Sequence, residues 1–347
     1  MVATCLRHLV DGFALGLAPH PVFTPRVAWS PPPTVQLTRM SRGCQGGFAT
    51  GGVESRLWRC SCLAQATCSR ESREAHMALD LDICAHLYAY TAQQPGESRR
   101  ELLDTVFADL SSAGYAGVEV MHTQVRSADD AAYVGGLSER YNLPVIGASF
   151  GGRMWDVAEH PALLAHAQVL IEALGDLDAW LLGVSTGAKP EGLKTPAELD
   201  TQAELLECLI DLCDECGILL NLHNHTYEVE NGEYEFRAMI ERIPDISLGP
   251  DVNWLRRAGI EPNDFLRRYA DRIIYLHLRD QLGDRWPEAL GEGDQDWVEL
   301  GRTLRDIGFD RYVGIELAHE RDTQFTRTMG ENFALSLRNL RDAFARV

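Results

Sequence analysis

The chain has 347 residues, of which 45% are hydrophobic and 24% charged, as in an ordinary soluble globular protein with one large domain or two smaller ones. It contains no run of 18 apolar residues, which argues against a membrane span. The formal net charge is −19, and residues 77–347 alone carry 24 basic and 47 acidic side chains, so we expect neither a nucleic-acid nor a membrane partner.

Residues 1–76 differ in composition from the rest of the chain. They hold 8 Arg against 4 acidic residues and five of the nine Cys, and they show no sustained hydrophobic period. At Met77 the sequence changes to MALDLDICAHLYAY, which is typical of a strand. We expect Met77 to be the natural start and residues 1–76 to be an upstream misreading. A disordered tail and an organelle-type presequence are the alternatives.

The cysteines indicate a reducing compartment. Their number is odd and their spacing irregular, which fits the cytoplasm better than a secreted disulfide scaffold. Cys213 and Cys216 form a CxxC pair just before Gly217, at an expected helix end. A redox pair needs a helix start, where the dipole lowers the thiol pKa, so we expect these two thiols to be ordinary helix-packing residues.

Strand-like and helix-like stretches alternate from Met77 onward, which predicts a parallel sheet. The expected strands are 80–87, 117–121, 143–149, 179–184, 218–223, 246–251, 273–278 and 312–317. Eight such units suit a (β/α)8 TIM barrel, the predicted fold class for residues 77–347. An open doubly wound sheet is the alternative, but its glycine fingerprint is missing from the first turn.

Two helix starts carry specific signals. Ser98 and Glu101 match the capping-box pattern and precede an apolar face at helical spacing. The run TPAE at 195–198 repeats the pattern with Pro in the first helical position, and Gly217 is placed to end that helix.

Ionisable side chains recur where the expected strands end, which is where a TIM barrel has its active site. They are Glu119 and His122; His223, His225 and Glu228; Asp251; His277 and Asp280; and Glu316. Each is costly to bury alone, but several that converge on one divalent cation offset one another. Carboxylates with imidazole favour Mn²⁺, Mg²⁺ or Co²⁺ and also accept Zn²⁺.

Some of these residues also have a plainer structural interpretation. Glu119 would then only form salt bridges inside the barrel, and Asp280 would cap a helix or orient His277. His122 and His319 would lie in solvent.

Residues 77–347 resemble the xylose-isomerase-like barrels of the sugar phosphate isomerase/epimerase superfamily. The most specific part is GPDVNWLRRAGIEPNDFLRRYADRIIYLHLRD at 249–280, followed by LGEGDQDW at 290–297 and YVGIEL at 312–317. The segments HNH at 223–225 and GPDVNW at 249–254 resemble those of the inosose dehydratases and of the branches that process 3-keto-glycosides.

The resemblance implies a metal, most often Mn²⁺, held by residues of strands five to eight. Asp251, His277 and Glu316 match three of these positions. The family usually has a glutamate at the end of strand five, where this chain has His223. We expect Glu228 to supply the fourth ligand, which leaves His223 and His225 as catalytic groups; the alternative is that His223 itself binds the metal.

The resemblance further implies proton abstraction beside the carbonyl of a keto sugar, with Glu316 and the two histidines as candidate acid and base groups, and an enediolate intermediate. Returning the proton gives isomerisation or epimerisation, which is the predicted function. Expelling a neighbouring group instead makes the protein a keto-sugar dehydratase or a 3-keto-glycoside lyase. An abasic-site nuclease is a further alternative, but it would need a basic groove, and residues 77–347 are strongly acidic. A non-catalytic barrel would be expected to lack the metal-ligand residues, but at least three of those positions are matched here.

Further residues are candidates for substrate binding. They are Trp254, Arg279, Glu119, His86 and Arg327. The sequence has no basic cluster that marks a phosphate site, so we expect an unphosphorylated sugar. The expected partner is this small molecule. Barrels of this kind often pair, so a homo-oligomer is one expectation, and a second subunit type is the expectation if the protein is a lyase.

Overall fold

The computed structural model describes residues 79–92 and 99–347. The predictions for residues 1–76, for the start at Met77 and for Ser98 as a helix cap fall outside these ranges and stay predictions. Among the described residues, no helix is both long enough and apolar enough to cross a membrane.

Eight parallel strands form the centre of the described chain, in the order β6-β5-β4-β3-β2-β1-β8-β7. Each lies within or overlaps one of the eight predicted strands, so the predicted fold class is confirmed. Their bounds are β1 Ile83–His86, β2 Val118–Met121, β3 Val145–Gly151, β4 Leu181–Ser185, β5 Leu219–Leu222, β6 Ser247–Leu248, β7 Leu276–Leu278 and β8 Val313–Glu316.

The sheet closes into a barrel between β6 and β7 through isolated bridges rather than a continuous ladder. Leu248 pairs with Ile273 and Asp251 with His277, both in parallel orientation. The Ile274 N–H donates to the Leu248 carbonyl at 2.9 Å and the His277 N–H to the Pro250 carbonyl at 3.0 Å. This closure brings the ends of β6 and β7 side by side.

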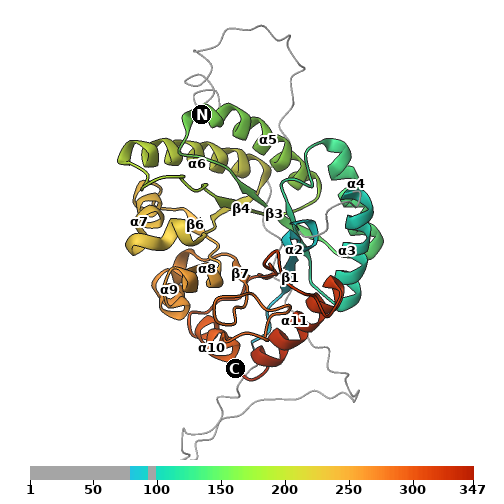
Figure 1. Ribbon diagram of the computed structural model, residues 1–347. Helices are drawn as coiled ribbons and strands as arrows, with labels where there is room; N and C mark the ends of the chain where they lie inside the picture. Colours follow the sequence, from blue (N-terminus) through green and yellow to red (C-terminus); the bar gives the residue numbers. More distant parts are fainter. Residues whose placement is uncertain (1–78, 93–98) are drawn as a thin grey trace, which may run out of the picture. The chain divides into compact units, whose positions relative to one another are not determined.

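The helices surround the strands (Figure 1). Their bounds are α2 Tyr88–Ala92, α3 Arg99–Ala113, α4 Ala128–Tyr141, α5 His160–Asp176, α6 Pro196–Cys216, α7 Thr226–Arg242, α8 Val252–Arg257, α9 Pro262–Arg268, α10 Trp297–Asp306 and α11 Met329–Phe344, with short 3-10 turns at Val157–Glu159 and Ala270–Arg272. Their apolar faces pack on the outside of the barrel and form one large core with it.

Helix α6 follows the sequence signals closely. Thr195 and Glu198 form a reciprocal capping box, Pro196 is the first helical residue, and Gly217 ends the helix in the left-handed conformation with φ of 71°. Cys213 and Cys216 are free thiols at the C-terminal end of this helix. Cys213 is buried, and burial raises its pKa to about 12, as expected for a packing thiol, whereas Cys216 is exposed.

Helix α7 does not run as one continuous helix. Residues 230–233 leave the helical conformation, and Asn231, Gly232 and Glu233 have φ values of 55°, 72° and 63°. The Glu233 carboxylate is held by Arg268 and by the Tyr269 hydroxyl at 2.7 Å. These tertiary contacts stabilise a conformation that is unfavourable for non-glycine residues.

Candidate functional site

A cavity of about 470 Å³ opens where the strands end. Its lining includes residues in or just after six of the strands, which are His86, Glu119, Ser149, His223, His277 and Glu316. This volume lies in the range of ordinary small-molecule sites. The position at the C-terminal face of a TIM barrel is the one at which such barrels carry their chemistry.

Residues of β7, β8 and the ends of β5 and β6 lie close together: His223, His277 and Glu316 line the cavity, and Asp251 is fully buried beside them. His277 Nδ1 lies 3.1 Å from His223 Nδ1 and 3.2 Å from Glu316 Oε2. Ligand atoms of His223, Asp251 and His277 all lie within 4.8 Å of one another. Three of the four proposed ligands, Asp251, His277 and Glu316, are therefore brought together with His223.

One carboxylate oxygen of Asp251 has no hydrogen-bond partner. Asp251 is fully buried and caps α8, with Oδ1 accepting from the Asn253 and Trp254 N–H groups at 2.8 and 3.1 Å. Its Oδ2 accepts no hydrogen bond of acceptable geometry, although Arg279 Nη2 lies 3.3 Å away. A buried carboxylate oxygen without a full partner, beside two imidazoles and a second carboxylate, fits a divalent cation.

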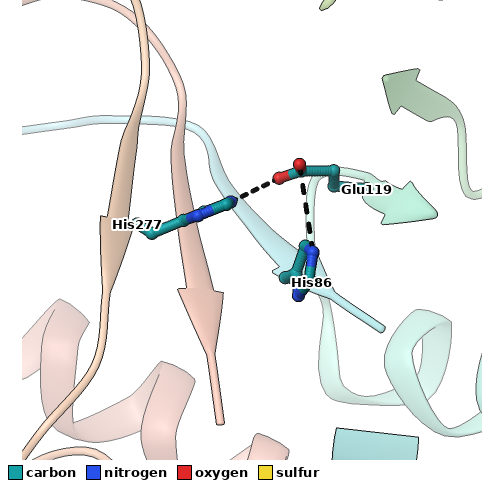
Figure 2. A group of neighbouring side chains, drawn as sticks. All are labelled: His86, Glu119 and His277. Atoms are coloured by element: carbon teal, nitrogen blue, oxygen red, sulfur yellow. Dashed lines mark hydrogen bonds and ion pairs between the residues drawn. The ribbon is translucent and has the colours of Figure 1, made fainter. Parts of the chain in front are cut away.

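His277 is held from the opposite side by Glu119 (Figure 2). Its Nε2 lies 2.6 Å from Glu119 Oε2, while Glu119 Oε1 accepts from the Ser149 hydroxyl at 2.8 Å. His86 Nε2 lies 2.5 Å from that hydroxyl and 4.0 Å from Glu119. Glu119 and His86 thus both line the cavity, and both carboxylate oxygens of Glu119 already have protein partners.

The charges in this group reinforce one another. Burial alone would raise the pKa of Glu119, but His277 and His86 outweigh it and lower the pKa to about 2. Burial lowers the pKa of His277, but Glu119, Glu316 and Asp251 outweigh it and raise the pKa to about 9. In the metal-free protein this is a buried pair of Glu119 carboxylate and His277 imidazolium.

Glu228 lies away from the cavity, against the sequence expectation that it is the fourth ligand. Its Oε1 accepts from the Thr186 N–H at 2.8 Å and from the Thr186 hydroxyl at 2.9 Å, and its Oε2 accepts from the His225 N–H at 2.5 Å. Glu228 is the capping-box residue of α7. Because these bonds already use both oxygens, this placement favours the alternative, in which His223 takes the strand-five position.

His225 lines the cavity beside His223, at a ring separation of 5.0 Å. Its Nδ1 faces Glu228 at 3.4 Å and the Tyr227 hydroxyl at 3.2 Å, which leaves Nε2 for a ligand. Burial lowers the pKa of His225, but the hydrogen bond and charge of Glu228 outweigh it and raise the pKa. Behind Glu228, Thr186 connects to the buried pair of Lys194 and Glu235.

An aromatic wall closes one side of the cavity. Trp254 and Trp286 both line it and meet edge to face at 5.7 Å. The Arg279 guanidinium lies against both rings, 5.1 Å from Trp254 and 5.4 Å from Trp286, and pairs with Glu316. Aromatic faces of this kind suit the apolar face of a sugar ring.

Two other sequence candidates have structural roles. Arg327 does not line the cavity, because it makes two bonds of 2.6 and 2.7 Å to Glu292 and a third to Asn332. Asp280 neither caps a helix nor contacts His277. It accepts from the N–H groups of Gly291 and Gly293 and thereby anchors the loop LGEGDQDW at 290–297.

The structure adds cavity residues that sequence reasoning missed or discounted. Ser149 and Trp286 had no motif of their own; the available signal was a polar residue at a strand end and a lone Trp in the loop after strand seven. His122 and His319 line the cavity instead of lying in solvent.

The sequence model of one family, described as the xylose isomerase-like TIM barrel, matches residues 107–342. The rhizopine catabolism protein MocC of Rhizobium meliloti is 27% identical over 210 residues, which are 57% of this chain and 63% of that protein. An inosose dehydratase of Geobacillus kaustophilus is 34% identical over 92 residues, 26% of this chain and 30% of that protein. Both matches cover less than two thirds of the relative's length.

Solved structures with the same fold include a sugar phosphate isomerase/epimerase from Parabacteroides distasonis, at a TM-score of 0.60 and 16% identity, covering 80% of this chain and 99% of that one. A D-allulose 3-epimerase from Methylomonas sp. has a TM-score of 0.60 and 19% identity, covering 77% and 100%. The 3-keto-D-glucoside 4-epimerase YcjR from E. coli has a TM-score of 0.58 and 16% identity, covering 76% and 100%. The family match spans more than half of the sequence, and the chain belongs to the xylose isomerase-like TIM barrel family.

Proposed function

We propose that this barrel is a divalent-metal-dependent isomerase or epimerase of an unphosphorylated keto sugar or sugar derivative. The observation that carries the proposal is the cluster of His223, Asp251, His277 and Glu316, of which His223, His277 and Glu316 line a cavity of sugar size and Asp251 is buried beside them. The structural relatives that are named as epimerases support this reaction class. We propose the sugar as the partner and the cytoplasm as the compartment. We also propose that the chain forms a homo-oligomer or pairs with a second subunit.

The four converging side chains would hold the metal, and Mn²⁺ is the first choice for this donor set. When bound, a divalent cation supplies a Lewis acid that polarises a substrate carbonyl and offsets negative charge on adjacent oxygens. Glu119 orients His277 through Nε2, and the buried walls limit the access of water to the reacting carbons.

The proton transfer falls to groups beside this cluster. His225 has a free Nε2, and Glu228 outweighs burial and raises its pKa; an imidazole placed there can take a proton from the carbon beside the carbonyl and return it. Glu316, at the end of β8, is the second candidate acid or base, since it lines the same cavity. Trp254 and Trp286 would hold the sugar ring between these groups.

A lyase that shares the first step is the alternative. The observation that favours it is the pair His223 and His225 at the end of β5, where the epimerases of the resemblance carry glutamate. The relative named inosose dehydratase supports the same choice. In a keto-sugar dehydratase or 3-keto-glycoside lyase, the electron pair left after proton removal would expel hydroxide or an alkoxide from the next carbon, and the acid form of the base would protonate it.

The test is a panel of ketoses and 3-keto-glycosides incubated in D₂O with Mn²⁺-loaded protein and followed by NMR and mass spectrometry. Deuterium beside the carbonyl together with an isomeric product supports the isomerase, whereas released water or aglycone supports the lyase. His225→Gln should slow the reaction by about 10²- to 10⁴-fold. Arg327→Gln, whose side chain is directed away from the cavity, is the matched control. Absence of exchange on every substrate that binds would contradict both functions.

A further inference from the structure

Arg279 is a buried cation within the proposed metal site. Its side chain is only 4% exposed, and its Nη2 pairs with Glu316 Oε1 and lies 3.3 Å from Asp251 Oδ2. Both carboxylates belong to the proposed ligand set. The guanidinium is held in this position by the two rings of the aromatic wall, Trp254 and Trp286.

The charge balance of the site depends on this side chain. Asp251 and Glu316 are both buried, and unpaired buried carboxylates are strongly destabilising. An arginine keeps its proton under all ordinary conditions, so it supplies a permanent positive charge. Arg279 therefore places its positive charge beside Asp251 Oδ2 and Glu316 Oε1, two oxygens that a divalent cation would need.

We propose that Arg279 is the internal counter-ion of the metal-free site and competes with the divalent cation for Asp251 and Glu316. The guanidinium would stabilise the empty barrel and, by the same contacts, weaken metal binding, so that metal entry exchanges one cation for another. This inference rests on the metal-dependent function proposed above. If the guanidinium instead only oriented the two carboxylates, loss of the Arg279 side chain would weaken metal binding.

Arg257 provides a matched control on the same aromatic wall. Its guanidinium lies 4.1 Å from the Trp286 ring and 5.7 Å from Trp254. Its hydrogen bonds go to the Gln281 side chain and the Asp284 carbonyl, and not to the proposed ligands. Removing Arg257 therefore removes a stacked cation from this wall without freeing either Asp251 or Glu316.

The experiment measures Mn²⁺ binding by isothermal titration and thermal unfolding in EDTA, using the full chain as wild type, Arg279→Met and Arg257→Met. Arg279→Met should bind Mn²⁺ about tenfold tighter or more, because one unit charge close to the site is removed. Its unfolding midpoint in EDTA should fall below that of the wild type, and saturating Mn²⁺ should restore most of the difference. Arg257→Met should keep the wild-type Mn²⁺ affinity.

Unchanged or weaker Mn²⁺ binding by Arg279→Met would overturn the competition. If this variant does not fold without metal, Arg279→Lys carries the test. A single ammonium cannot fork between two carboxylates, so this variant should bind Mn²⁺ more tightly than the wild type; equal or weaker binding would again overturn the inference. A wild type that binds none of Mn²⁺, Mg²⁺, Co²⁺ and Zn²⁺ after reconstitution would remove the metal from both proposals. Metal binding without any turnover would remove only the proposed function.

Discussion

His277 is fixed at both ring nitrogens, and this determines what it can offer to a metal. The Glu119 carboxylate accepts at Nε2, so in the neutral ring the proton stays on that nitrogen. The lone pair is then on Nδ1, which faces His223 and Glu316. Glu119, a substrate-binding candidate by sequence, thus acts on the proposed metal through His277.

Substituting Glu119 should therefore weaken metal binding without removing a ligand. We expect Glu119→Gln to reduce Mn²⁺ affinity by about 10- to 100-fold, the range found when the carboxylate behind a ligating histidine is changed. Equilibrium dialysis with elemental analysis measures this effect. Ser149→Ala removes the 2.8 Å bond to Glu119 Oε1 and the contact with His86 Nε2 but leaves the Glu119–His277 bond in place, so it should give a smaller loss. An unchanged affinity in Glu119→Gln would show that His277 does not depend on Glu119.

The placement of Glu228 leads to the opposite expectation for that residue. Glu228→Gln should keep its bound metal, because the side chain caps α7 and does not line the cavity. It should lower the unfolding free energy by about 1–3 kcal/mol, since an amide cannot accept all of the present bonds. Elemental mass spectrometry and urea unfolding test the two parts. Asp251→Asn is the control and should lose the metal. Metal loss in a folded Glu228→Gln protein would restore Glu228 as a ligand.

At this scale the sequence predicted that Asp251, His277 and Glu316 lie close together, because each stands at a recognisable strand end and the barrel brings such ends together. It did not predict that Glu228 lies outside the cavity, because its carboxylate was considered only as a metal ligand. Its position three residues after His225, at the start of a helix, is also the capping-box position, and that signal was present in the sequence.

Whole elements were predicted more reliably than single contacts, because their signals are local. The α6 helix has a capping box at its start and a glycine at its end, and all eight strands lie where apolar stretches alternate with helices. The break at residues 230–233 in α7 also contains a local signal, the turn dipeptide Asn231-Gly232, which was not used in the sequence prediction. The position of Glu233 further depends on Arg268 and Tyr269, which are far away in the sequence.

The glycine that ends α6 offers a test of local backbone control. Gly217 has φ of 71°, and a Cβ there would meet no atom within 4 Å, so Gly217→Ala is opposed only by the left-handed backbone. We expect it to lower the unfolding free energy by about 1–2 kcal/mol. Gly136→Ala is the matched control, since a Cβ there is equally unobstructed but the residue lies inside α4. That change should be neutral or stabilising by up to about 1 kcal/mol. Urea unfolding of both variants decides the point, and equal effects would contradict it.

The closure of the barrel is uneven, and its weakest seam passes through the proposed metal site. Strands β3 and β4 share five registered pairs, whereas β6 and β7 are joined only by two isolated bridges. One of those bridges pairs Asp251 with His277, both proposed ligands. A metal held by residues at the ends of β5, β6, β7 and β8 would therefore join the part of the barrel that the backbone holds least.

Removing the metal should consequently loosen this seam more than the rest of the molecule. A ligand present at about 100 times its Kd contributes roughly 2.7 kcal/mol to the stability of the state that binds it. We expect EDTA to accelerate amide hydrogen exchange at residues 247–251 and 273–278 by up to about 100-fold, with much smaller changes at residues 145–151 and 181–185. Hydrogen-exchange mass spectrometry on Mn²⁺-loaded and EDTA-treated protein measures the difference, and Asp251→Asn should resemble the EDTA-treated state without any chelator. An equal acceleration in all strands would mean that the metal stabilises the fold as a whole. No acceleration would mean that the seam is closed by the protein alone.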